Sequence, residues 1–476
     1  MVWTAFQKYS KIIIQFVSGI ILARLLSPYD YGCIGMLSIF MVLAETVLEG
    51  GFGSALIQKK QPTQEDYSTI FWWNLGMSLV LYVVLFVCAP AIARFYNIPI
   101  LRDVLRVQGL VLFIYAFNIV QRSQLRKKLN FKVLSIVSVS TAIVSLCITI
   151  WMAYRGFGVW ALVTQYLVVA GIPSIVFWFY IKWRPIWTFS WKSFKELFSF
   201  GFYMFLTHLI NRFCSKLSQL LIGKIYSPIT LGYYSKASGV ENLASHSISS
   251  VITQVSYPLY AQIQDNKVAM SNMVKRMTMT VAYITFPLMF LLILIAKPVF
   301  VLLYSERWLA SVPYFQVLCL VGLSDCLQAV NTQTIAAIGK SRIMFRWTLI
   351  KRTVGMSFMI GGLFWFGMKG FLIGIIIYNW FCYFVNIGLV SKYIGYKWSQ
   401  QLLDLLPMTL VSIVAFSASF GIGKLLNFGF YSDGAVKLLV FIVVYLGWSL
   451  LFKPESYKYT LSIIPKKFRF WEKTNI

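Results

Sequence analysis

Apolar segments of about 20 residues recur along the whole chain, separated by short polar loops. Such segments cross a bilayer as helices, because its core holds no water to satisfy exposed backbone groups. The mean hydropathy of +0.72 and the charged fraction of 12% fit this interpretation. We therefore expect an all-α polytopic membrane protein. The expected transmembrane helices, about fourteen by a hydropathy window, lie near residues 6–26, 33–55, 69–93, 104–121, 133–154, 158–181, 199–224, 232–260, 279–304, 312–338, 347–368, 370–391, 402–425 and 435–452.

The chain contains an internal repeat with an offset of 200 residues. The motif S-P-x-x-x-G follows an apolar segment at Ser27–Gly32 and again at Ser227–Gly232. Self-similarity at a fixed offset indicates duplication. A duplicated membrane bundle is typical of transporters, whose substrate sites lie between the repeats.

The basic residues indicate how the spans are oriented. If the N-terminus is cytoplasmic, 29 of the 43 Lys and Arg residues fall on the cytoplasmic side. This bias predicts that both termini lie inside. The longest polar stretches, 182–198 and 262–278, are too short for a soluble domain. We therefore expect no catalytic residues and a function within the bilayer.

The net charge of +28 does not indicate a nucleic-acid partner, since the basic residues lie between apolar segments rather than beside stacking aromatic residues on a soluble face. Seven cysteines lie within or beside apolar segments, without a C-x-x-C pair or a His at zinc spacing. We expect neither a metal nor a cofactor. The densest basic cluster, Arg122 to Lys132, is interpreted as a topology determinant near anionic lipids.

The span at 199–224 has a polar face. Its polar residues follow the three- and four-residue spacing of one side of a helix, and they are His208, Asn211, Arg212, Ser215, Lys216 and Gln219. A central Arg or Lys costs about 2.5–3.5 kcal/mol to insert into a bilayer. The face therefore requires water, a counter-charge or an anionic ligand. Internal ion pairs that only hold the bundle together are the alternative.

The repeat extends this polar character to other spans. In the span at 6–26, Lys11, Gln15 and Arg24 are further polar candidates. Four spans are expected to line a lumen, namely 6–26, 33–55, 199–224 and 232–260.

Two acidic residues, Glu45 and Glu49, lie one helical turn apart and match Ser245 and Ser249 in the repeat. Two carboxylates in a low-dielectric span repel each other. One of them can stay protonated or bind a coupling ion, or the two can pair with the cations of the polar face. The sequence leaves these alternatives open.

Several sequence blocks in register resemble the bacterial polysaccharide exporters. These are lipid-linked oligosaccharide flippases of the multidrug/oligosaccharidyl-lipid/polysaccharide superfamily, and the blocks are similar to the colanic-acid-exporter branch. The resemblance covers essentially residues 1–400. It rests on the segments Leu22–Gly32, Ser54–Lys60, Gln64–Thr69, Gly156–Val163 and Leu231–Asp265.

The resemblance implies two pseudo-symmetric six-helix lobes arranged as a V, with two C-terminal helices appended. The expected domains are an N-lobe at 1–182, a cytoplasmic linker at 183–198, a C-lobe at 199–395, two further spans at 396–452 and a basic cytoplasmic tail at 453–476.

The resemblance also implies alternating-access transport of an undecaprenyl-pyrophosphate-linked oligosaccharide across the bacterial cytoplasmic (inner) membrane, for O-antigen, capsule or exopolysaccharide assembly. Membrane lipids, a polysaccharide polymerase and assembly proteins are the other expected partners. A cationic face suits a pyrophosphate. The expected substrate-binding residues are Arg212, Lys216, His208, Asn211, Lys11, Gln15 and Arg24, and the expected coupling-ion or proton residues are Glu45 and Glu49.

Two other functions compete with this one. A cation-coupled drug antiporter of the same superfamily would use Glu45 and Glu49 as its cation site, but a basic cavity disfavours a cationic cargo. A membrane glycosyltransferase or polymerase would use Asp30 as a catalytic carboxylate. The loop at Ser27–Gly32 is too short to hold an acceptor, so we expect a protein that is not an enzyme.

Overall fold

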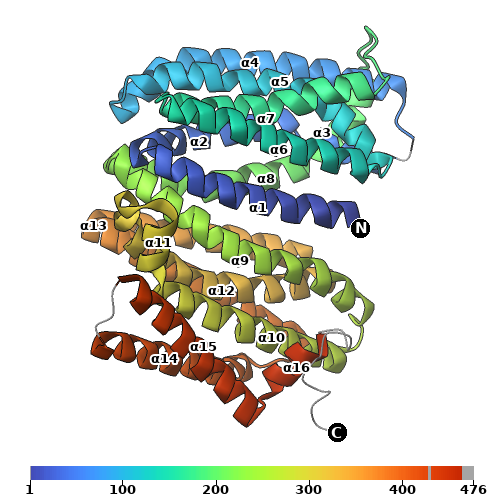
Figure 1. Cartoon of the computed structure of the whole chain (residues 1–476). Coiled ribbons are helices and arrows are strands. Elements are labelled where there is room, and N and C mark those ends of the chain that lie inside the picture. Colours follow the sequence, from blue (N-terminus) through green and yellow to red (C-terminus); the bar gives the residue numbers. More distant parts are fainter. Residues whose placement is uncertain (1, 60, 427–429, 464–476) are drawn as a thin grey trace. The chain divides into compact units, whose positions relative to one another are not determined.

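The computed structural model describes residues 2–59, 61–426 and 430–463. Throughout these ranges the regular structure is helical and contains no strand (Figure 1). The expected all-α class is therefore confirmed. The chain divides into two compact units, Met1–Ser235 and Lys236–Ile476. The last part of the expected tail at 453–476 lies outside the described residues.

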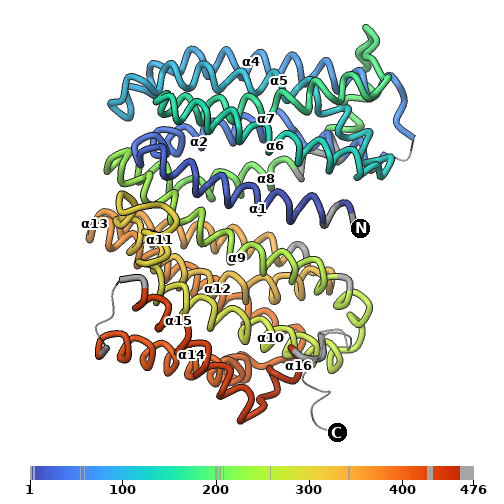
Figure 2. Tube along the Cα trace, viewed as in Figure 1, coloured from blue at the N-terminus to red at the C-terminus, as the bar shows by residue number. Residues whose placement is uncertain are grey.

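The first unit is a bundle of long helices. Its elements are α1 (Val2–Leu25), α2 (Pro28–Glu49), α3 (Phe52–Gln58), α4 (Gln64–Tyr96), α5 (Ile100–Lys127), α6 (Phe131–Tyr154), α7 (Val159–Tyr180), α8 (Trp191–Ile225) and the first turns of α9 (Pro228–Gln262). Helix α1 packs against α6, α2 against α8, and α4 against α5 (Figure 2). Helix α7 packs against both α5 and α6.

The second unit continues from α9. Its further elements are α10 (Lys267–Leu294), α11 (Ala296–Tyr304), the short 3₁₀ helix η1 (Glu306–Ser311), α12 (Val312–Ala337), α13 (Ser341–Ile394), α14 (Trp398–Leu426), α15 (Phe430–Phe452) and α16 (Glu455–Ile463). Helix α12 packs against α10 and α13, and α14 packs against α10 and α15. Helix α13 is broken at Gly367, whose φ of 61° suits glycine.

Ten helices of the described residues are long and apolar enough to cross a membrane, so the chain is a multi-pass membrane protein. Helix α13 is one of the ten, and its two arms on either side of Gly367 match two of the expected spans. Helices α1, α8 and α9, which carry the polar faces, are not among the ten. The number of fourteen spans therefore stays a prediction.

The repeated motif S-P-x-x-x-G begins a helix each time. The Ser27 hydroxyl accepts a hydrogen bond from the Asp30 backbone N–H at 3.3 Å, and the Ser227 hydroxyl accepts one from the Thr230 N–H at 3.1 Å. Serine is a preferred N-cap residue, and proline suits the first helical position. The motif therefore marks the starts of α2 and α9.

The glycines of the motif let α2 and α9 approach closely within the first unit. A Cβ atom on Gly32 would overlap the carbonyl oxygen of Pro228, and a Cβ atom on Gly232 would overlap that of Pro28. The contact is reciprocal, as expected for a duplicated element. Only a residue without a side chain permits such an approach of two backbones.

The segment between α7 and α8 is bound to the beginning of α4. The Ile186 N–H donates to the Ser68 hydroxyl and the Ser190 N–H donates to the Thr69 hydroxyl, both at 3.1 Å. Helix α8 begins at Trp191, several residues before the expected start near 199, because the Ser190 side chain caps it. Residues 181–190 are thus docked onto the first unit.

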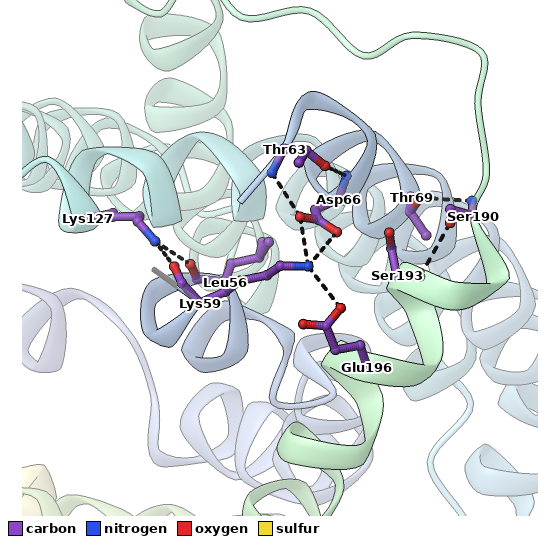
Figure 3. A network of polar contacts seen from close by, with 9 residues as sticks. All are labelled: Leu56, Lys59, Thr63, Asp66, Thr69, Lys127, Ser190, Ser193 and Glu196. Atoms are coloured by element: carbon purple, nitrogen blue, oxygen red, sulfur yellow. Dashed lines mark hydrogen bonds and ion pairs between the residues drawn. The ribbon is translucent and has the colours of Figure 1, made fainter. Parts of the chain in front are cut away.

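An ion-pair network joins the first turns of α8 to α3 and α4 (Figure 3). The Lys59 ammonium lies 3.1 Å from the Asp66 carboxylate and 3.0 Å from the Glu196 carboxylate. Phe194 and Leu197 of the same turns are buried in an apolar cluster with residues of α3 and α4. Helix α8 therefore belongs to the first unit, and the expected division into lobes with a linker at 183–198 stays a prediction.

Candidate substrate-binding site

A polar cavity of about 490 Å³ lies among α1, α5, α6 and α7. Its cationic lining residues are Lys11, Arg122 and Arg126, and no acidic residue lines it in the part of the chain that the structure describes. Its uncharged polar lining consists of Gln7, Gln15, Ser18, Tyr115, Ser138, Thr141, Ser145 and Gln165. We name it the cationic cavity.

Helix α1 supplies one wall of the cationic cavity. Gln7, Lys11, Gln15 and Ser18 are spaced by four, four and three residues, so they follow one side of the helix. This side meets α6, where the Ser135 hydroxyl lies 3.4 Å from the Gln7 side-chain oxygen, to which it donates. The structure thus brings Lys11 and Gln15, both predicted from sequence, into the cavity wall.

Helix α5 supplies the two arginines. Arg122 and Arg126 lie one turn apart and share one side of the helix. The next residue, Lys127, points elsewhere, and its ammonium donates to the Leu56 carbonyl oxygen at 3.3 Å and also to the Lys59 carbonyl oxygen. Neither arginine takes part in an ion pair of the described residues. Both guanidinium groups can therefore serve an anionic ligand.

These two arginines were not among the candidates that the sequence indicated for the site, since we interpreted their cluster as a topology determinant. The available signal was their spacing of four residues at the end of an apolar span, which places both on one helical side. Arg122 is also half-buried, which is unusual for a charge that only faces lipid headgroups.

A second cavity, of about 250 Å³, lies among α2, α3, α5 and α8. Glu45, Glu49 and His208 line it, as do Arg122 and Arg126. The two arginines thus line both cavities, and α5 forms the wall between them. The second cavity balances two carboxylates against two guanidinium groups, whereas the cationic cavity has no such balance.

Arg212 and Lys216 lie on α8 and are not part of either cavity lining. The Lys216 ammonium donates to the Gln219 side-chain oxygen at 3.1 Å, and the Ser38 hydroxyl of α2 donates to the same oxygen at 2.5 Å. The charges of Arg212 and Lys216 attract the Glu45 carboxylate. Part of the polar face thus joins α8 to α2 through a hydrogen bond, and no ion pair of the described residues includes Arg212 or Lys216.

Other polar residues that the sequence indicated lie outside the two cavities. Asn211 is half-buried and Arg24 is exposed near the end of α1, and neither lines the two cavities. The expectation that the span at 232–260, with Ser245 and Ser249, lines a lumen stays a prediction. The Cys326 thiol of α12 donates to the Ser245 carbonyl oxygen and accepts from the Ser249 hydroxyl, each at 3.6 Å, so both serines contact α12.

A multi-pass helical bundle with a duplicated element and an internal cationic cavity defines a membrane protein of the transporter class. The structure of the lipid II flippase MurJ in an inward closed conformation has the same fold. The two chains are 16% identical, with a TM-score of 0.73 over 95% of this chain and 98% of the other.

The family model of the polysaccharide biosynthesis proteins matches residues 21–313, and the chain belongs to this family. It is 28% identical to the teichuronic acid biosynthesis protein TuaB of Bacillus subtilis (strain 168), over 72% of each chain. It is 24% identical to the lipopolysaccharide biosynthesis protein WzxC of Escherichia coli (strain K12), over 89% of this chain and 87% of that protein. The resemblance drawn from the sequence blocks is therefore confirmed.

Proposed function

We propose that this protein moves an undecaprenyl-pyrophosphate-linked oligosaccharide from the cytoplasmic to the periplasmic leaflet of the bacterial cytoplasmic membrane, for the assembly of a surface polysaccharide. The cationic cavity carries the proposal, because it holds three cationic side chains and no acidic one among the described residues. The diphosphate is the anionic part of such a cargo. Arginine can bind phosphate oxygens through two parallel hydrogen bonds.

The relatives support a role in glycan export. TuaB and WzxC are named for the biosynthesis of teichuronic acid and of lipopolysaccharide, and the solved structure of similar fold is that of a lipid II flippase. A lipid-linked glycan as cargo agrees with the names of these relatives and with the flippase fold. Both termini on the cytoplasmic side, as the basic residues predict, would place Arg126 and the end of α5 near the leaflet where such a cargo is made.

A cationic drug is a less suitable cargo. Glu45 and Glu49 could attract a cation, but the same cavity holds Arg122 and Arg126, which repel it. The larger cavity offers a cation no carboxylate in its described lining. The charges therefore favour an anion.

A glycosyltransferase or polymerase activity is disfavoured by the position of Asp30. Its carboxylate accepts hydrogen bonds from the Ser27 backbone N–H at 2.9 Å and from the Ser27 hydroxyl at 2.7 Å. Asp30 thus belongs to the capping box that begins α2. This carboxylate has a structural role that accounts for both of its contacts.

Anion binding would remove an electrostatic cost that the empty protein bears. An arginine within a bilayer costs about 2.5–3.5 kcal/mol on insertion scales. Glu45 and Glu49, which line the second cavity, offset part of this cost for Arg122 and Arg126, whereas no carboxylate of the described lining lies beside Lys11. A diphosphate beside Lys11, Arg122 and Arg126 would supply the missing negative charge.

The polar face of α8 would contact the cargo at another stage of the cycle. The side chains of His208 and Arg212 are exposed, and Asn211 and Lys216 are half-buried. These residues, with Gln15 and Arg24 of α1, are proposed to bind the headgroup or the glycan. A coupling-ion or proton role for Glu45 and Glu49 remains a prediction.

The test is deletion of the gene followed by analysis of lipid-linked glycans. Undecaprenyl-linked repeat units should accumulate on the cytoplasmic side, and a variant that combines Arg122→Ala with Arg126→Ala should fail to export them at matched abundance in the membrane. Lys127→Ala combined with Lys128→Ala is the matched control, because it also removes two positive charges from the same cluster, from residues that line neither cavity. Loss of glycan assembly itself would point to an enzyme instead.

A further inference from the structure

A buried carboxyl group in the second unit lies outside both cavities described above. Glu241 of α9 is 5% exposed, and its Oε1 atom has no hydrogen-bond partner among the described residues. Carboxyl groups are rarely buried to this degree without a partner, because transfer of the charged form out of water costs far more than transfer of the neutral acid. Glu241 therefore requires a physical explanation.

The neighbours of this oxygen on α10 and α12 are apolar, whereas the Ser245 hydroxyl, one turn along α9, is close enough to donate a hydrogen bond to the carboxyl group. A Cβ atom on Gly322 of α12 would lie only 2.6 Å from the Glu241 Oε1 atom, so the glycine makes room for the carboxyl group. The thioether side chain of Met289, from α10, approaches the same point. Neither neighbour offers a hydrogen-bond donor or a positive charge from its side chain.

Two cations of the second unit, Lys236 and Arg352, have other contacts. On α9 itself, the Lys236 ammonium lies 4.1 Å from the ring centre of Tyr304 and 5.6 Å from that of Trp308. On α13, Arg352 donates to the Tyr378 hydroxyl at 3.2 Å. None of the ion pairs of the described residues includes Glu241.

The remaining titratable groups that face Glu241 from α12 carry negative charge or none. They are the thiols of Cys319 and Cys326 and the carboxylate of Asp325, which repels a charged Glu241. Asp325 is exposed, accepts a hydrogen bond from the Gln328 amide at 3.3 Å and is attracted by the charge of Arg352. Of the two carboxyl groups, Asp325 is therefore the one suited to carry the charge.

The geometry points to Glu241 as a proton-binding site: the carboxyl group is held as the neutral acid when this side of α9 is packed on α12, and it releases its proton when that side opens to water. A proton fits better than a metal ion. No group of three or more His, Cys, Asp or Glu residues in the described chain could hold a metal, and the Glu241 oxygen faces Gly322 and Met289.

This site differs in kind from Glu45 and Glu49. Those two carboxylates line a cavity together with two arginines, and cationic side chains attract both of them: Arg122 attracts Glu49, and Arg212 and Lys216 attract Glu45. Glu241 has no such neighbour. Uptake and release of one proton at Glu241 would couple cargo movement to the proton gradient. This coupling rests on the proposed function.

Infrared spectroscopy of the purified full-length protein, without cargo, tests the proton site. At neutral pH the wild-type protein should show a protonated-carboxyl band that is absent from Glu241→Gln and unchanged in Glu306→Gln, which alters an exposed acidic residue of the same unit. Because glutamine resembles the neutral acid, Glu241→Gln should also keep the wild-type Tm at neutral pH. An unchanged band in Glu241→Gln, or a large loss of Tm from a broken ion pair, would refute the proposal.

Transport in proteoliposomes tests the coupling. For one proton per cargo, a gradient of one pH unit is worth about 1.36 kcal/mol and should change the transbilayer ratio of cargo about tenfold. Glu241→Gln should bring that ratio to the value without a gradient, while Glu306→Gln should keep the response. A gradient response that survives in Glu241→Gln contradicts the coupling. Absence of any cargo movement in the wild type would count against the proposed function, and the infrared result would still decide the proton site.

Discussion

At the residue scale, the direction of each side chain on α5 separates cations that line the cavities from a cation that contacts the backbone. Arg122 and Arg126 share the side of α5 that lines both cavities, whereas Lys127 turns away and donates to the last carbonyl groups of α3. Residues that adjoin in sequence thus have different roles, because successive side chains on a helix point in different directions.

Replacement of Arg122 should test the anion site most directly. A hydrogen bond to a charged group contributes about 1.5–3 kcal/mol, so Arg122→Ala should weaken cargo binding by about 10- to 150-fold. Arg122→Lys should recover part of this loss, since lysine keeps the charge but not the planar fork. Export is measured at matched expression.

The same export assay should compare Arg212, on the polar face of α8, with Arg122. Arg212→Ala is expected to impair export with the protein still folded, and Arg212→Lys to restore it in part. Wild-type export by Arg212→Ala, together with failure of Arg122→Ala, would place the headgroup in the cationic cavity alone. The reverse result would make Arg122 structural.

The glycine of the second repeat allows a sharp steric prediction. A Cβ atom on Gly232 would overlap the Pro28 carbonyl oxygen, which belongs to a backbone and cannot rotate away. Overpacking of this kind costs about 1–3 kcal/mol, so Gly232→Ala should lower the Tm in detergent. Gly239→Ala on the same helix is the control, because nothing lies within 4 Å of a Cβ atom there. Equal Tm values for the two variants would contradict the close crossing of α2 and α9.

At the element scale, the start of α8 is held by the first unit. The Ile181–Ser190 segment is bound to α4, and Lys59 joins Asp66 to Glu196 (Figure 3). Asp66 also completes the capping box of α4 with Thr63. A short polar network therefore fixes where three helices begin or end.

The charge of Lys59 gives this network a defined pH dependence. Burial alone would lower the pKa of Lys59, but its hydrogen bonds to Glu196 and Asp66 outweigh burial and raise the pKa above its usual range. The associated stability is present below the unfolded-state pKa of about 10.4 and is lost as pH rises through the folded-state value. Lys59→Met should cost up to about 1 kcal/mol at neutral pH.

The measurement is the Tm of wild type and Lys59→Met as a function of pH. Their difference should be constant near neutral pH, shrink in alkaline solution as Lys59 loses its charge, and shrink in strong acid as Asp66 and Glu196 are protonated. Lys192→Met, which replaces an exposed lysine in the first turn of α8, should show no such difference. A difference that changes between mildly acidic and neutral pH would assign the effect to another group.

At the scale of the whole molecule, ten helices of the described residues can cross a membrane, and the family is that of the polysaccharide biosynthesis proteins. The two compact units divide within α9, so the duplicated motif at its start belongs to the first unit. The cationic cavity lies wholly within that unit, and Glu241 lies in the other. Cargo charge and proton are thus assigned to different halves of the chain.

Topology reporters test the orientation on which the direction of transport depends. With both termini inside, a reporter fused after Lys128 should read cytoplasmic and one fused after Asp433 should read periplasmic, because 29 of the 43 basic residues lie on the cytoplasmic side in this arrangement. The opposite pattern would reverse the proposed direction of export.

The sequence by itself determined the features that depend on local pattern. Hydropathy over about 20 residues located the helices, and the repeated S-P-x-x-x-G motif marked the starts of α2 and α9. The period of the polar residues placed Lys11 and Gln15 on one side of α1. These signals act between residues that are near in sequence, so no knowledge of packing is needed to read them.

Only the tertiary structure decided which polar groups meet. It placed Arg122 and Arg126 in the lining of the cationic cavity, Asp30 in a helix cap and the Ser245 carbonyl oxygen beside Cys326 of α12, and it left the Glu241 Oε1 atom without a hydrogen-bond partner among the described residues. The physical reason is that every helix of a membrane bundle satisfies its own backbone, so its hydropathy and period are similar whichever neighbour it has. Close packing at a few small residues, such as Gly322 against Glu241, selects which helices become neighbours. The identity of the neighbouring helix then determines whether a buried charge has a partner.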